Sequence, residues 1–200
     1  MSNTRNRFFT GIIFLLVAEV LTIISSTGLY SFFPDVFYVL TTIVSSCVRL
    51  LAFGFLIAGL AIMYPCSRYI RRAFYMAIII AGIETVYIPL LFLGSIVTYF
   101  SASIEFILQI LILYNCIDGI ASYFDRLGDR DRFYLGGRIR SIVAFFIGLA
   151  CLVSWLNLLP FDIFKTNGAD KVISFSVALL EACGHGVFTY YLIRSCKRDY

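Results

Sequence analysis

Five charged or titratable side chains lie inside apolar stretches of the chain: Glu19, Arg49, Glu84, Glu181 and His185. Placing an Asp, Lys or Arg at the centre of a bilayer costs about 2.5 to 3.5 kcal/mol, so such residues usually have a partner or a function. Carboxylates beside a histidine can carry protons or hold a small cation. The residue types therefore predict a ligand-binding or proton-binding cluster.

The depths of these residues agree with a shared cluster. At ~1.5 Å per residue, Glu19, Arg49, Glu84 and Glu181 fall about 16 to 23 Å from the predicted cytoplasmic boundary, near the midplane. Three carboxylates would then face one guanidinium. Because an uncompensated carboxylate in a low-dielectric interior tends to become neutral, we expect at least one to be protonated or to bind a cation or solute.

Polar residues accompany these charges at helical spacing, and residues three or four apart share a helix face. The sets are Thr42, Ser45, Ser46 and Arg49; Asn115, Asp118 and Ser122; and Ser174, Glu181, His185 and Thr189. Asp118 therefore joins the candidate site, and Glu181 with His185 could relay a proton. Glu105 and Gln109 are predicted to lie near the outer end of a helix, Glu105 as a solvated group.

The elements that must position these residues are membrane-spanning helices. Of the 200 residues, 60% are hydrophobic and only 14% are charged, outside the range of soluble domains. Each apolar run is long enough for a helix to cross a core of ~30 Å, and the runs are too long for barrel strands. We expect an all-α integral membrane protein forming a single domain over 1–200, with six spans: Phe8–Ser26, Val36–Tyr64, Ala73–Phe100, Ser103–Phe124, Ile142–Phe164 and Val172–Ile193.

The basic residues predict the orientation. All but three of the 16 Lys and Arg residues fall at one end of the predicted spans, the exceptions being Arg49, Lys165 and Lys171. By the positive-inside rule, we expect both termini to be cytoplasmic. We also expect the protein to lie in the cell membrane. The basic loops are expected to contact the bilayer and its anionic lipids rather than nucleic acid.

No catalytic framework is evident in the sequence. The 6 cysteines lie within spans or near the cytoplasmic face, and there is only 1 histidine, so neither a disulfide set nor a His-pair zinc site is expected. Asp118 and Gly119 suggest the Asp-Gly motif of membrane CDP-alcohol phosphotransferases, but the further aspartates lack that spacing. We expect no cofactor, no metal and no enzymatic activity.

Self-similarity suggests three parallel helical hairpins as pseudo-repeats, about 8–72, 73–141 and 142–200. A period of about 66 residues places Glu19 on Glu84 and aligns Gly54, Gly119 and Gly186. Such a repeat predicts a bundle with pseudo-threefold symmetry.

The segments GLACLVSWLNLLP (148–160) and YNCIDGIASYF (114–124) resemble the HdeD-like membrane proteins. The resemblance extends loosely over the whole chain, although the first hairpin lacks the Asp-Gly-Ile element. It implies a six-helix protein of three hairpin repeats, associated with acid resistance and without an established enzymatic activity.

Two functions agree with this sequence. In the first, the midplane residues handle a small cationic solute or protons, in a transporter or in the solute-binding membrane subunit of one. In the second, the protein is a non-catalytic accessory, scaffold or stress-response membrane protein that contacts lipids or a membrane-protein partner. Its buried charges then only fix the packing of the helices.

Overall fold

The computed structural model describes residues 2–27, 35–90, 95–158 and 168–197. Within these ranges the fold is all-helical, as predicted, and no strand occurs. The elements in chain order are α1 Ser2–Ser25, α2 Asp35–Met63, η2 Tyr64–Cys66, α3 Arg68–Leu90, α4 Ser95–Arg126, α5 Arg130–Ser154, η3 Trp155–Leu158 and α6 Ala169–Cys196.

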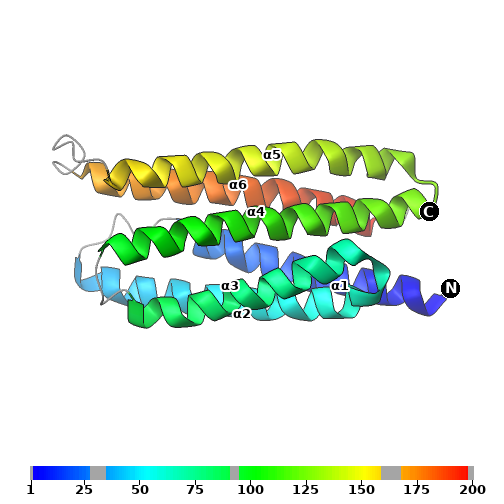
Figure 1. Ribbon diagram of the computed structural model, residues 1–200, viewed down its shortest axis with the longest axis horizontal. Helices are drawn as coiled ribbons and strands as arrows, with labels where there is room; N and C mark the ends of the chain where they lie inside the picture. The colour runs from blue at the N-terminus through cyan, green and yellow to red at the C-terminus, as the bar shows by residue number, and fades with distance from the viewer. Residues whose placement is uncertain (1, 28–34, 91–94, 159–167, 198–200) are drawn as a thin grey trace.

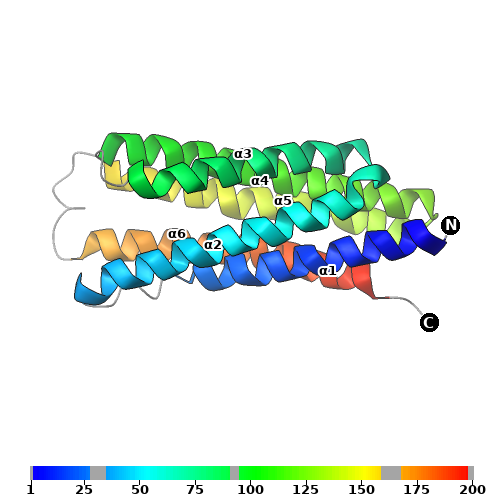
Figure 2. The same cartoon turned by 90° about the horizontal axis from the view of Figure 1, so that it is seen from below.

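The six α-helices of the described ranges form an elongated up-and-down bundle (Figure 1). Each helix packs against its neighbours in the chain, and α1 also packs against α6, which closes the helices into a ring. Figure 2 shows the ring as two layers, with α3, α4 and α5 above α2, α1 and α6. The central helices of the two layers touch through Phe8 of α1 and Tyr123 of α4, whose rings stack with centroids 3.7 Å apart.

Five of these α-helices are long and apolar enough to cross a membrane. The described part of α3 is more polar, because Arg68, Arg71, Arg72 and Glu84 all lie on it. Large apolar side chains also point outward, such as Leu152 and Phe145, with exposed fractions of 69% and 63%. An apolar outer surface of this extent suits lipid rather than water, so the chain is an integral membrane protein.

The helix boundaries differ from the predicted spans in two ways. Several helices extend past the predicted spans at the basic end; α5, for example, begins at Arg130 rather than near Ile142. Hydropathy marks only the lipid core, whereas a helix can continue through charged residues. The third and fourth spans also divide earlier than predicted, since α3 ends at Leu90 and α4 begins at Ser95. Pro89 is therefore the penultimate residue of α3.

Close helix contacts depend on small residues at particular positions. A methyl group on Gly11 of α1 would lie 2.9 Å from the carbonyl oxygen of Gly59 on α2 and 2.2 Å from Cγ of Met63. Larger residues at Gly11 would therefore force α1 and α2 apart. The aligned glycines of the proposed repeat have different surroundings: Gly119 faces Ile70 closely, whereas nothing lies within 4 Å of a methyl group built on Gly54 or Gly186. The hairpin repeat stays a prediction.

The basic segments gather at one end of the bundle, which we call the basic end. α1 begins and α6 ends there, and so do the connections from α2 to α3 and from α4 to α5 (Figure 1). At the α4–α5 connection, Gly128 has a φ of +78°, a left-handed conformation that favours glycine. Asp129 then caps α5 by accepting a hydrogen bond of 3.1 Å from the backbone N–H of Arg132. Lys165 and Arg198 lie outside the described residues.

Candidate functional site

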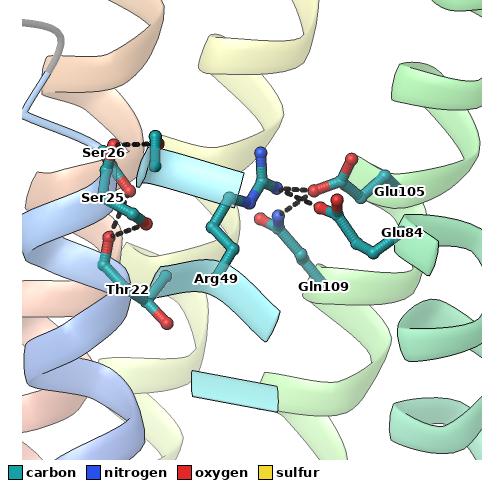
Figure 3. Close-up of polar contacts among 8 residues, drawn as sticks. Thr22, Ser25, Ser26, Arg49, Glu84, Glu105 and Gln109 are labelled. Carbon is teal, nitrogen blue, oxygen red and sulfur yellow. Dashed lines mark hydrogen bonds and ion pairs between the residues drawn. The ribbon is translucent and has the colours of Figure 1, made fainter. Parts of the chain in front are cut away.

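Arg49 is the centre of a buried polar group that joins three helices. Its guanidinium extends from α2 toward α3 and α4 (Figure 3). Nη2 lies 3.0 Å from Oε1 of Glu84 on α3 and also contacts Oε1 of Glu105 on α4. Gln109 donates a hydrogen bond of 3.1 Å from Nε2 to the same Glu105 oxygen. We call these four residues the Arg49 cluster.

The sequence spacing on α4 explains how Glu105 and Gln109 act together. They are four residues apart, so both side chains lie on the same face of the helix. Both residues are buried, as is Glu84, while Arg49 retains a side-chain exposure of 28%. The planar guanidinium group of Arg49 thus contacts two carboxylates, those of Glu84 and Glu105.

A second buried pair joins the first and last helices. Oε2 of Glu19 on α1 lies 2.7 Å from Nδ1 of His185 on α6, and both side chains are about 95% buried. Thr189, one turn after His185, donates its hydroxyl to the His185 carbonyl oxygen at 2.8 Å. This places a carboxylate and an imidazole in direct contact, the arrangement that proton exchange between them requires.

A small cavity separates the Glu19–His185 pair from the Arg49 cluster. Its volume is about 30 Å³, and its polar lining consists of Glu19, Thr22, Arg49, Gln109 and His185. A space of this size accommodates one or two water molecules. Nε2 of His185 and Oε1 of Gln109 are buried and have no hydrogen-bond partner among the described residues. Water in the cavity is the natural partner for both atoms.

Four of the six predicted site residues therefore line or adjoin this cavity: Glu19, Arg49, Glu84 and His185. The other two do not take part in these contacts. Glu181 lies one turn before His185 and is partly exposed, and it forms no ion pair with a described residue. Asp118 lies closer to the basic end, where Oδ1 is 3.0 Å from Nη1 of Arg140 on α5.

Glu105 and Gln109 are the residues that the sequence reading misplaced. Glu105 was expected to be solvated near the helix end, but α4 begins eight residues before the predicted span, so Glu105 lies well inside the bundle. Residues 91–94 read Leu-Phe-Leu-Gly, which is as apolar as a span, so hydropathy does not separate the two helices. The signal that could have divided them is Pro89 followed by Gly94.

The charges of the site do not balance. Glu19, Glu84 and Glu105 supply three carboxylates against the single permanent positive charge of Arg49, and His185 is the other group able to carry one. Even with a protonated histidine, one carboxylate remains uncompensated. A buried site of this composition should hold an additional proton or a cation.

Comparison of the chain with protein-family models, with curated proteins and with solved structures found no match.

Proposed function

We propose that this membrane protein takes up and releases protons at Glu19, which lines the cavity, and at Glu84 and Glu105, which lie beyond Arg49 and Gln109. The observation that carries the proposal is the cavity itself, placed between the Glu19–His185 pair and the Arg49 cluster, with unpaired atoms of His185 and Gln109 at its wall. Water bound there would contact the Glu19–His185 pair on one side, and on the other Arg49 and Gln109, which in turn contact Glu84 and Glu105.

The size of the cavity favours protons over an organic cation. About 30 Å³ accepts water but not a vitamin-sized solute. A larger cationic substrate would need the helices to separate. The resemblance to HdeD-like proteins adds to the proposal, because that family is associated with acid resistance.

Proton flux into proteoliposomes tests this proposal. The purified protein is reconstituted with a trapped pH-sensitive dye, and a potassium gradient with valinomycin supplies the driving voltage. We expect flux above that of empty vesicles, and its loss in Glu19→Gln and Glu105→Gln. Asp125→Asn is the matched control, because Asp125 is an exposed carboxylate at the end of α4. The proposal fails if the wild-type protein conducts no more protons than empty vesicles.

Infrared spectroscopy gives a second readout that does not depend on flux. A protonated carboxylic acid has a carbonyl stretch separate from that of a carboxylate. We expect this band in the wild-type protein at neutral pH, and we expect it to weaken in one of Glu19→Gln, Glu84→Gln or Glu105→Gln. That variant identifies the residue that carries the additional proton.

A second candidate function is a non-catalytic accessory or stress-response role in which the charges only hold the helices together. The direct contacts of Arg49 with both Glu84 and Glu105 favour it. In that case the glutamate variants lose stability, and no flux exists to be lost.

In either case we propose the cell membrane as the location, with the basic end in the cytoplasm.

A further inference from the structure

The basic end carries a cleft that is remote from the cavity of the proposed function. It has a volume of about 570 Å³ and lies where η2, the start of α3 and the end of α4 meet. Its polar lining consists of Ser67, Arg68, Tyr69, Arg71, Ser122 and Arg126. Three arginines therefore line the cleft, and no carboxylate does.

The arginines come from two helices, and two of them contact other groups of the fold. Arg68 begins α3, and its guanidinium lies over the Tyr69 ring, 5.2 Å from the centroid. Arg71 follows one turn later on α3. Arg126 reaches across from the last turn of α4, where its Nη1 lies 3.5 Å from the carbonyl oxygen of Cys66.

These arginines differ from Arg132 and Arg140, which lie at the same end of the bundle and have carboxylate partners. Arg140 pairs with Asp118, and Arg132 pairs with Asp129 at 3.2 Å. Arg68, Arg71 and Arg126 form no ion pair with any described residue. The three guanidinium groups are exposed and have no carboxylate beside them in the cleft, so the cleft attracts anions. Planar guanidinium groups suit phosphate oxygens in particular.

The residues beside the cleft are of the kinds found at the level of lipid headgroups. Tyr64 and Tyr75 lie beside it, with their hydroxyl oxygens 2.9 Å apart. Tyr75 follows Arg71 by one turn and is 57% exposed, and Ile78 and Ile79, one turn further along α3, are exposed too. Aromatic side chains with polar tips are typical of the membrane interface. A lipid with its phosphate at the arginines would find an apolar path for its acyl chains along α3.

We propose that this cleft binds the phosphate headgroup of an anionic membrane phospholipid. The arginines hold the phosphate oxygens, the Ser67 and Ser122 hydroxyl groups supply further donors, and the exposed face of α3 accepts the acyl chains.

Native mass spectrometry of the full chain in neutral detergent tests the proposal with phosphatidylglycerol as the probe and phosphatidylcholine as the neutral reference. The test variant combines Arg68→Gln, Arg71→Gln and Arg126→Gln. The control variant combines Arg5→Gln, Arg7→Gln and Arg130→Gln, which removes the same charge from exposed arginines outside the cleft. We expect the test variant to retain phosphatidylglycerol at least about tenfold more weakly than the wild type, because each basic residue near an anionic lipid contributes substantially to binding. The control should stay within about twofold.

Three outcomes would overturn the proposal. If both triple variants lose phosphatidylglycerol equally, the lipid is held by general attraction to positive charge and not by the cleft. If the wild type retains the two lipids equally, it does not recognise the headgroup. Binding of soluble glycerol phosphate as strongly as of the lipid would show a site for a small phosphate-bearing solute. Thermal unfolding of the glutamine variant in the same detergent shows whether it is folded. A third variant, Arg68→Lys with Arg71→Lys and Arg126→Lys, keeps the charge, and we expect it to retain more phosphatidylglycerol than the glutamine variant; equal loss in both would contradict a role for the charge.

Discussion

Oε2 of Glu19 lies 2.7 Å from Nδ1 of His185, although 166 residues separate them in the chain. The pair connects the first helix to the last and thus closes the ring of six. Arg49 of α2 likewise connects its helix to α3 and α4, through contacts with Glu84 and Glu105. Buried polar contacts therefore join helices on both sides of the central cavity.

Glu19 and His185 should be energetically coupled. In a double-mutant cycle of Glu19→Ala and His185→Ala, we expect a coupling free energy of about 1 kcal/mol, because buried polar contacts between membrane helices have values near this size. Unfolding titrations in mixed micelles measure it. The cycle of Glu19→Ala with Arg140→Gln is the control and should be additive. Additivity in the first cycle would contradict the contact.

Arg49→Gln should destabilise the bundle by about 3 kcal/mol, because Glu84 and Glu105 would lose the charge that compensates them. Arg72→Gln, which removes an exposed arginine of α3, should change the free energy of unfolding by less than about 0.5 kcal/mol. Adding Glu84→Gln and Glu105→Gln to Arg49→Gln should restore much of the loss. If the neutral triple variant is no more stable than Arg49→Gln alone, loss of charge compensation is not the reason why Arg49→Gln destabilises the bundle.

Asp118→Asn should have little effect on stability or on proton flux. The Asp118 and Arg140 side chains retain exposures of 30% and 42%, so solvent screens the pair, and such pairs contribute up to about 1 kcal/mol. The same micelle titrations and vesicle assays measure both quantities. If proton flux falls as far in Asp118→Asn as in Glu105→Gln, Asp118 takes part in proton binding after all.

The sequence predicted the depth of the buried charges but not their pairing. Depth follows from the position of a residue along a helix, and on this basis Glu19, Arg49, Glu84 and Glu181 were predicted to lie at similar levels. Pairing depends on the direction in which each side chain points, which is set by how the helices pack. For this reason the single predicted cluster is divided into two groups by the cavity, and Glu105 occupies the place expected for Glu181.

The all-helical fold was predictable because apolar length and helical spacing determine it locally. The end of α3 was not, because residues 91–94 are as apolar as the helices on either side. Because the predicted fourth span began too late in the chain, Glu105 was predicted to be a solvated residue near the helix end instead of a buried one. The largest mistake about the site thus came from a few residues without any charge.

Gly11→Ala should separate α1 from α2 and cost about 1 to 3 kcal/mol, because the new methyl group would meet the Gly59 carbonyl oxygen at 2.9 Å. Gly82→Ala on α3 is the control, since nothing lies within 4 Å of its methyl position. Gly82→Ala should raise the free energy of unfolding by up to about 1 kcal/mol, because alanine favours the helix more than glycine does. Thermal unfolding in detergent compares the two, and equal shifts would show that α1 and α2 are not closely packed at Gly11.

The orientation can be tested by labelling single cysteines in a cysteine-free background. Leu127→Cys lies in the exposed connection at the basic end, and Lys171→Cys lies at the exposed start of α6, at the opposite end. With an impermeant maleimide on intact cells, we expect labelling of Lys171→Cys and protection of Leu127→Cys. Inside-out vesicles should reverse the pattern. Labelling of both positions from one side would exclude a bundle that crosses the membrane.

Closure of the ring by α1 and α6 has a consequence for biosynthesis. The ribosome delivers Glu19 first and His185 last, and at about 5 to 20 residues per second the interval is roughly 10 to 30 seconds. During that interval the newly inserted first helix carries a carboxylate without its partner. A chain interrupted before α6 keeps this polar group without its histidine in the bilayer, so an unfinished product should be less stable there than the complete protein.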